Sequence, residues 1–192
     1  MGQIATDDFT RADSGTLGAN WTKLSGFSDL RITSNACKAS VSSPDCVDAY
    51  TGSGSVSLDQ YSQCTINNEN DGGPTVRSDT NSTFYLLDTI STNYTVYKCI
   101  SGSFTQINQV SVTGVSGDTA YIEVQGTTIV TKQNGTTRNN FTDSAINGSS
   151  VGGPYPGLHC SGSGLVEDLF AMGDFAAASS VKPRRRLMGA GV

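Results

Sequence analysis

The sequence contains few of the residues on which catalytic and metal sites depend. Only 15% of its 192 residues are charged, His159 is its one histidine, and its three glutamates are Glu69, Glu123 and Glu167. A single imidazole excludes a zinc site built from several histidines, and no G-x-S-x-G motif of a serine hydrolase is present. We expect no metal centre and no cofactor, and we expect His159 to serve in the core or on the surface.

Long apolar runs are also absent, as is the periodicity of a helix. No run approaches the roughly 18 apolar residues of a membrane span, and no segment repeats its apolar residues convincingly with a helical period. The first residues, Met1-Gly2-Gln3-Ile4, show neither the basic nor the apolar region of a secretory signal. The sequence therefore predicts a chain that is made in the cytoplasm and does not insert into a membrane.

Serine, threonine, asparagine and glycine are abundant in place of charged and apolar residues, and strand-forming residues recur among them. Low charge density and recurring strand formers argue against disorder. In a thin two-layer β structure every other residue faces water, so threonine and serine can occupy the outer faces. At this length we expect one domain of this kind.

The most informative stretch is Thr119 to Gly135, with the sequence TAYIEVQGTTIVTKQNG. It contains two runs rich in β-branched residues, separated by Gly126, and it ends in Asn134-Gly135. Asparagine and glycine tolerate positive φ, which tight turns require. The stretch predicts two consecutive antiparallel strands at the centre of a sheet.

Further short strands are expected at intervals of about ten residues, which is typical of a sandwich or barrel. We place them at 3–9, 29–33, 36–41, 47–50, 60–67, 83–87, 94–100, 104–112, 158–161 and 165–175. We expect loops at 68–74 and 138–149. In the first loop, Glu69, Asn70 and Asp71 could suit Ca²⁺, but a solvated turn is favoured over a metal site.

Several segments together resemble the concanavalin A-like lectin/glucanase superfamily. They are the hairpin above, the opening Asp7-Asp8-Phe9, the sequence Leu17-Gly18-Ala19-Asn20-Trp21, and the closing segment 166–175, which ends in Gly-Asp-Phe. The resemblance covers about residues 5–175. It implies an all-β, two-sheet antiparallel jelly-roll sandwich over 1–175 whose first and last strands pair, of the kind seen in phage structural proteins.

The glucanase branch of this superfamily carries its catalytic carboxylates along one strand, as in E-x-D-x-x-E. A retaining glycosidase needs two carboxyl groups about 5 Å apart in one cleft. Here Glu123 stands alone in its strand, and Glu167 and Asp168 are adjacent, so they point to opposite faces. We therefore expect no enzyme activity.

Five cysteines, Cys37, Cys46, Cys64, Cys99 and Cys160, match no zinc-binding spacing. Two interpretations stay open. The cysteines are buried thiols in strands, or one disulfide forms, most plausibly Cys37–Cys46 across a turn at Pro44.

The net charge changes sign at residue 176. Residues 1–175 hold all 17 acids and 8 bases, giving 8 − 17 = −9, whereas 176–192 holds four bases and no acid, giving +4. We expect 176–192 to be a flexible basic tail outside the sandwich. If it docks onto an acidic partner, the arginines and two apolar neighbours would carry the contact. These docking residues are Lys182, Arg184, Arg185, Arg186, Leu187 and Met188.

Two functions fit these features. A polar β domain without an export signal suits a virion protein, assembled in the host cytoplasm and exposed on the particle. It would be a capsid decoration or fibre-associated protein anchored by its tail to the major capsid protein or another virion protein. The alternative is a carbohydrate-binding, lectin-like module, which could recognise cell-surface glycans. Its stacking residues would be Trp21, Tyr94, Tyr97 and Tyr155. For Trp21, Tyr94 and Tyr97, packing in the core or across strands is favoured over sugar stacking. Either protein could form a homo-oligomer.

Overall fold

The computed structural model describes residues 2–43, 45–66, 72–90, 92–147, 151–162 and 166–175, with the side chains of 166–168 excepted. These residues form fifteen β-strands and no helix, in two large antiparallel sheets stacked on each other. The expected all-β jelly-roll sandwich is confirmed. No helix among the described residues is long and apolar enough to cross a membrane.

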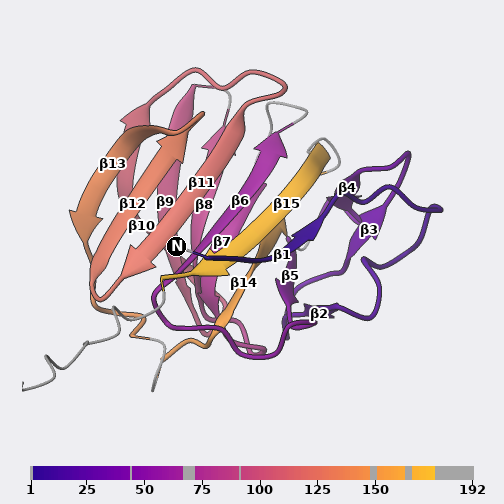
Figure 1. The fold of residues 1–192 in the computed structure, drawn as a ribbon, viewed down its shortest axis with the longest axis horizontal. Helices are drawn as coiled ribbons and strands as arrows, with labels where there is room; N and C mark the ends of the chain where they lie inside the picture. The colour runs from indigo at the N-terminus through magenta and orange to yellow at the C-terminus, as the bar shows by residue number, and fades with distance from the viewer. Residues whose placement is uncertain are drawn as a thin grey trace, which may run out of the picture.

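Sheet A has eight strands and lies in front in Figure 1. Seven of them follow the order β13 (Thr136–Thr142), β12 (Thr128–Gln133), β11 (Thr119–Gln125), β6 (Gln60–Ile66), β15 (Val166–Asp174), β4 (Cys37–Ala39) and β3 (Leu30–Ile32). The eighth, β1 (Gly2–Asp7), pairs with β15. The first and last strands are therefore neighbours, as the resemblance implies.

Sheet B has seven strands and lies behind sheet A in Figure 1. Its order is β10 (Ser103–Ser111), β9 (Asn93–Ile100), β8 (Phe84–Ile90), β7 (Gly72–Ser78), β14 (Tyr155–Cys160), β5 (Cys46–Tyr50) and β2 (Trp21–Lys23). Neighbours in this order pair antiparallel, so sheet B is a continuous surface from β10 to β2.

The predicted hairpin is confirmed. Strands β11 and β12 pair from Ala120↔Gln133 to Gln125↔Thr128. Gly126 has a φ of 56°, and Asn134 has a φ of 49°, so both turns use the left-handed backbone that these residue types tolerate.

Two expected loops overlap strands, and the loop expectation is wrong there, at 72–74 in β7 and at 138–142 in β13. Strand β7 contains Gly72, Gly73 and Pro74, residues that usually end strands, yet all seven of its residues are buried inside sheet B. Strand β13 is polar and mostly exposed because it lies at the edge of sheet A. In each case the neighbouring strands decide the conformation over the local preference.

The main core lies between the sheets, and two residues expected to stack on sugars belong to it. Trp21 is 8% exposed, its ring packs on Tyr50 and Phe170, and its Nε1 donates to Asp7 Oδ2 at 2.9 Å. Tyr94 is 1% exposed in the same cluster. Neither ring faces solvent, so the core role favoured for both is confirmed and their assignment as sugar-stacking residues is wrong.

All five cysteines are buried, and none of them forms a disulfide. Cys37 lies in β4 of sheet A and Cys46 lies in β5 of sheet B, so the two belong to different layers. The structure therefore has buried thiols and no disulfide between these two. Two other expectations concern residues that lie outside the described ranges: the basic tail 176–192 and the loop residues Glu69, Asn70 and Asp71.

Candidate ligand site on the outer face of sheet B

Sheet B carries a second apolar cluster on the face turned away from sheet A. Along β5, Cys46 and Tyr50 belong to the main core, whereas Val47 and Ala49 belong to the second cluster. Successive side chains of a strand point to opposite faces, so Val47 and Ala49 lie on the outer face. The buried members of this cluster are Leu24, Phe27, Val47, Ala49, Phe84, Leu86 and Cys99.

Phe104, near the start of β10, extends over this cluster. Its ring centroid lies 6.0 Å from that of Phe27, 5.9 Å from that of Phe84 and 6.4 Å from that of Tyr97. Its side chain is still 38% exposed, which makes Phe104 one of few large apolar residues that face water. An aromatic ring held in place by other rings and open on one side is a rigid platform for an apolar ligand surface.

The outer face of sheet B is concave. Strands β10 and β14 are separated in the sheet by β9, β8 and β7. In a flat sheet, four strand spacings would place them about 19 Å apart. The ring centroids of Phe104 in β10 and His159 in β14 are nevertheless 6.0 Å apart. The sheet curvature and the long aromatic side chain together bring these residues to one place.

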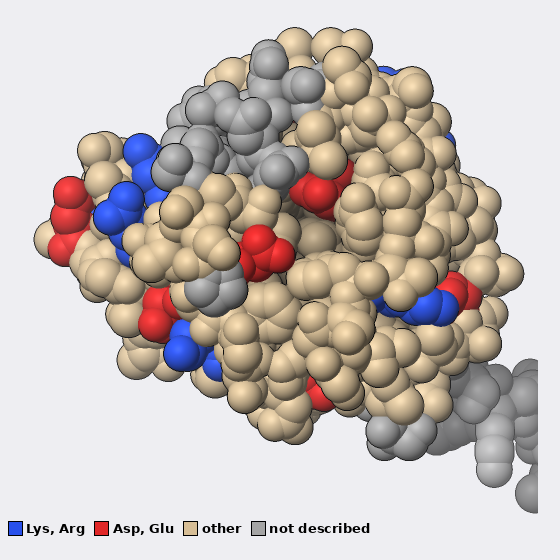
Figure 2. Space-filling model, turned by 180° about the vertical axis from the view of Figure 1, so that it is seen from behind, with Lys and Arg blue, Asp and Glu red and all other residues tan. Residues whose placement is uncertain are grey.

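A hollow of about 220 Å³ lies at this place. Figure 2 views the molecule from the side of sheet B and shows acidic side chains beside a recess in the middle of this face. The residues that line the hollow come from β8, β9, β10, β14 and the segments beside them. They are Asp45, Leu86, Asp88, Ile90, Tyr97, Phe104, His159 and Ser161.

His159 is a buried polar group in the lining of this hollow. It is 3% exposed, and neither ring nitrogen has a hydrogen-bond partner among the described residues. Asp45 Oδ2 lies 3.6 Å from His159 Nε2, too far for a hydrogen bond but close enough for a charge interaction. His159 holds the pKa of Asp45 below its ordinary value. A buried nitrogen without a partner is costly, so a ligand that supplies a hydrogen bond here is favoured.

Strand register places Asp88 across the hollow from His159. His159 pairs with Gly73 of β7, and Thr75 of the same strand pairs with Leu86 of β8. Because β7 and β8 are antiparallel, Gly73, two residues before Thr75, lies opposite Asp88, two residues after Leu86. Strand β7 lies between the two polar residues, which places their backbones about 10 Å apart across the sheet. Gly73 adds no side chain to the space between them.

Of the four aromatic residues expected to bind sugar, two lie on this concave face. Tyr97 lines the hollow, and Tyr155 packs against the apolar cluster under it. The sequence gives no signal for Phe104, Asp45 or Asp88 as ligand-binding residues. Tyr97 lies in a segment, 94–100, whose residues alternate in character, but only the curvature of the sheet brings the other residues together.

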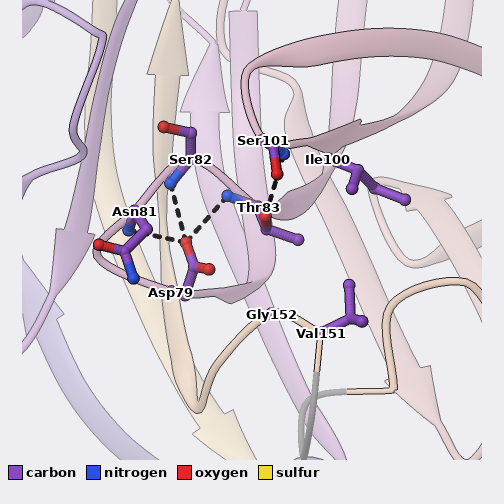
Figure 3. Close-up of a pocket in the computed structure, with 8 residues that line it drawn as sticks. All are labelled: Asp79, Asn81, Ser82, Thr83, Ile100, Ser101, Val151 and Gly152. Atoms are coloured by element: carbon purple, nitrogen blue, oxygen red, sulfur yellow. Dashed lines mark hydrogen bonds between the residues drawn. The ribbon is translucent and has the colours of Figure 1, made fainter.

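A second hollow, of about 580 Å³, lies at the rim of the sandwich. It is formed by the β7–β8 turn, the β9–β10 turn and the segment before β14, and Figure 3 shows its lining. Asp79 Oδ1 accepts hydrogen bonds from the backbone N–H groups of Asn81, Ser82 and Thr83 at 2.8–2.9 Å. Thr83 Oγ1 accepts one from the backbone N–H of Ser101.

Many of the polar groups that line the rim hollow are therefore already engaged in hydrogen bonds within the protein. Its carboxylate oxygen and two of its hydroxyl groups hold the turns together, including the Ser82 hydroxyl, which donates to the backbone of Ser25. No aromatic residue is among the described residues that line this hollow. Among the described residues, the concave hollow is smaller but combines exposed aromatic surface with a buried imidazole whose nitrogens make no hydrogen bond. We take it as the candidate site.

Comparison with known proteins agrees with the fold. No protein-family model matches the sequence, and no curated protein matches it. The structure is similar to the carbohydrate-binding module CBM66 from Bacillus subtilis, with a TM-score of 0.62 and 18% identity over 80% of this chain and 94% of that one. It is also similar to a Bacillus subtilis protein of unknown function with a galectin-like fold, with a TM-score of 0.62 and 9% identity over 91% and 96% of the two chains.

A third similar structure is the β-glucanase of Bacillus licheniformis, with a TM-score of 0.55 and 10% identity over 91% of this chain and 99% of that one. These neighbours have the concanavalin A-like jelly-roll fold, so the fold implied by the resemblance is confirmed. Identities this low establish a shared fold, and function has to be argued from the site.

Proposed function

We propose that this protein is a carbohydrate-binding, lectin-like module whose ligand occupies the concave hollow of sheet B. The observation that carries the proposal is the pairing of Phe104, which is 38% exposed, with His159, whose buried nitrogens make no hydrogen bond to any described residue. A sugar ring has an apolar face that stacks on an aromatic ring, and hydroxyl groups that bond with imidazole and carboxylate groups. The hollow offers both kinds of surface within one space.

The lining supports this proposal because its polar groups are few and lie at its edges. Asp45 and His159 stand at one side and Asp88 stands beyond β7, while Leu86 and Ile90 contribute apolar surface. Ligand sites are commonly mostly apolar, with a small number of polar groups that set the orientation. Two of the similar structures are a carbohydrate-binding module and a β-glucanase. By analogy, they support the proposal that this protein binds a carbohydrate.

We further propose that the bound sugar is not cleaved. A glycosidase needs a carboxyl group with a raised pKa to act as general acid. The pKa of Asp45 is instead lowered, because His159 stabilises its charged form. Burial raises the pKa of Asp48 to about 7, but this side chain is 2% exposed and lines neither hollow.

A glycan array followed by isothermal titration of each hit tests the function. We expect at least one neutral oligosaccharide to bind, and incubation of that ligand with the protein to leave it intact. Absence of any bound glycan would contradict the binding proposal. Release of reducing ends that is abolished by Asp45→Asn or Asp88→Asn would contradict the proposal that the sugar is not cleaved.

The function of a capsid decoration or fibre-associated virion protein remains a separate proposal. It is supported by the polar composition and by the basic residues of 176–192, which lie outside the described ranges. The two functions are compatible, since a virion surface lectin would satisfy both. A chain that ends at residue 175 should keep its fold and its glycan binding but lose attachment to a particle; unchanged attachment would refute the anchor.

A further inference from the structure

The concave hollow occupies only part of the outer face of sheet B, and packed rings cover the part beside it. Alternate residues of β8 point to this face. Leu86 and Ile90 line the hollow, whereas Phe84, two residues before Leu86, does not. Phe84 is fully buried, and the rings of Phe27 and Phe104 pack against it with centroids 5.6 Å and 5.9 Å away. Along β8, the hollow therefore ends between Phe84 and Leu86.

The covered part of the face is filled by the apolar cluster. Phe27 comes from the segment between β2 and β3, and it packs on Phe104 with centroids 6.0 Å apart and an angle of 83° between the ring planes. Leu24, Val47 and Ala49 of the same cluster are fully buried. A glycan chain that ran along the strands would meet these packed side chains at the end of the hollow.

Tyr97 and Phe104 form a corner inside the hollow. Both residues line it, their ring centroids are 6.4 Å apart, and their planes are nearly perpendicular, at 88°. A sugar ring that stacks on the face of one of them is therefore stopped at its side by the other. The sugar can be extended only in directions that lead away from this corner.

The hollow is also short in the direction across the strands. His159 from β14 and Phe104 from β10 line it from opposite sides of the sheet, with ring centroids 6.0 Å apart. Its volume is about 220 Å³, whereas sites that hold a whole drug-sized ligand have about 300–1,000 Å³. A space of this size suits one sugar ring, because several linked rings need a longer groove.

We propose that the concave hollow binds the terminal sugar of a glycan and excludes sugars within the chain. This inference rests on the proposed carbohydrate-binding function and adds which part of the glycan is recognised. A sugar within a chain carries glycosidic bonds on two sides and needs two exits from its site, whereas a terminal sugar needs one. Phe27 and Phe104 close the exit along β8, so the rest of the glycan would leave the hollow from one side.

Isothermal titration with monosaccharides tests the first consequence. The probes are glucose, galactose, mannose, xylose and fructose, each compared with its own linear hexamer, and any further sugar found on a glycan array is added in the same two forms. For a sugar that is recognised, we expect the monosaccharide to bind within about tenfold of its hexamer, because one ring makes most of the contacts. A site that reads several linked sugars would lose nearly all of its affinity with the monosaccharide.

The number of protein molecules bound per chain tests the second consequence. The probe is the polysaccharide of the recognised sugar, before and after partial acid hydrolysis, which multiplies the chain ends at constant mass. We expect the number of protein molecules bound per gram to rise in proportion to the number of chain ends. Binding along the chain would instead give a number that stays constant until the fragments become shorter than the site.

Ser161→Leu locates this binding in the hollow. Ser161 is half-buried and lines the hollow, so a leucine there would fill part of the space. The variant should weaken the binding of the monosaccharide and of the polysaccharide together, by about tenfold. Asn81→Leu is the matched control, because Asn81 is exposed and lines the rim hollow, and it should bind both probes as before. If Ser161→Leu fails to fold, the counts with the original protein remain decisive.

The outcomes distinguish the two proposals. Three results would each overturn the terminal-sugar inference and leave the proposed function standing: hexamers that bind while their monosaccharides do not, a count that ignores the number of chain ends, or polysaccharide binding that persists in Ser161→Leu after monosaccharide binding is lost. If the folded protein binds none of these sugars and no glycan of an array, the proposed function fails, and the inference fails with it.

Discussion

Phe104 and His159 lie with ring centroids 6.0 Å apart and a 60° angle between their planes, although three strands separate them in sheet B. This contact closes one side of the concave hollow. It also links Phe104, an exposed aromatic residue that lies over the apolar cluster, to the buried imidazole below it. The account of the site depends on this contact more than on any single residue in the hollow.

Replacing Phe104 with alanine should weaken glycan binding about tenfold, because it removes the stacking surface. Isothermal titration with the best ligand from the array measures the effect. Leu169→Ala is the matched control, since Leu169 is 43% exposed and belongs to β15 of sheet A. An equal loss in both variants would show that Phe104 has no special role in the site.

Replacing Arg77 with methionine should destabilise the protein by about 3 kcal/mol or more. Arg77 is 3% exposed, and its guanidinium donates to the backbone carbonyls of Leu58, Gly126 and Ile146 at 3.0, 2.7 and 2.8 Å. Methionine would leave all three acceptors without this donor at one end of the sandwich. Urea unfolding measures the change.

The control for Arg77→Met is Arg138→Met. Arg138 is exposed and donates one hydrogen bond to the Gln133 side chain at 2.8 Å. Its loss should cost less than about 1 kcal/mol. Similar losses of stability in the two variants would contradict the claim that the three hydrogen bonds of Arg77 stabilise the fold.

Asp48 should make the fold less stable as the pH rises from about 4 to about 7. Burial, and to a lesser degree the charge of Asp29, raises its pKa from the usual 3.8 to about 7. The folded state therefore holds a proton that the unfolded state releases in this range, and this contribution is lost once the pH passes the folded pKa. The full difference corresponds to about 4 kcal/mol as an upper bound.

Asp48→Asn tests this dependence because it removes the titrating group. The variant should be more stable than the original protein at pH 8 and should lose that advantage near pH 4, as measured by thermal or urea unfolding. A stability difference that does not change with pH would contradict the raised pKa. Taking the difference at each pH removes the contributions of the other carboxyl groups, such as Asp143, whose pKa is lowered.

The thiols should be unreactive in the folded protein. All five cysteines are buried, and burial raises the pKa of the Cys99 thiol to about 11, which leaves little thiolate at neutral pH. A thiol reagent should react with none of them under native conditions and with all five in denaturant. Fewer than five thiols in denaturant would reveal a disulfide and contradict the structure.

Much of the fold could be predicted from the sequence because strand and turn preferences are properties of short local segments. The β11–β12 hairpin follows from β-branched runs around Gly126 and from the Asn134-Gly135 turn. Strands β7 and β13 could not be predicted in this way. The first begins with Gly-Gly-Pro and the second is polar, and each exists because a neighbouring strand supplies its hydrogen bonds.

The candidate site was harder to predict than the fold, because it depends on the curvature of a whole sheet. Tyr97 could be recognised by its alternation pattern. Phe104 and His159 are 55 residues apart in the sequence, from 104 to 159, and no spacing rule connects them. Trp21 lies in the core, as the favoured interpretation of a lone tryptophan predicts, and its indole N–H donates to Asp7; only its alternative role as a sugar-stacking residue is wrong.

The most direct test of the central claim is an NMR titration of the isotope-labelled protein with the best glycan from the array. The account predicts that backbone signals change for residues of the concave face, above all Asp88, Tyr97, Phe104 and His159, while those of the rim hollow around Asp79 stay in place. Changes confined to the rim hollow, or no changes with any glycan, would contradict it.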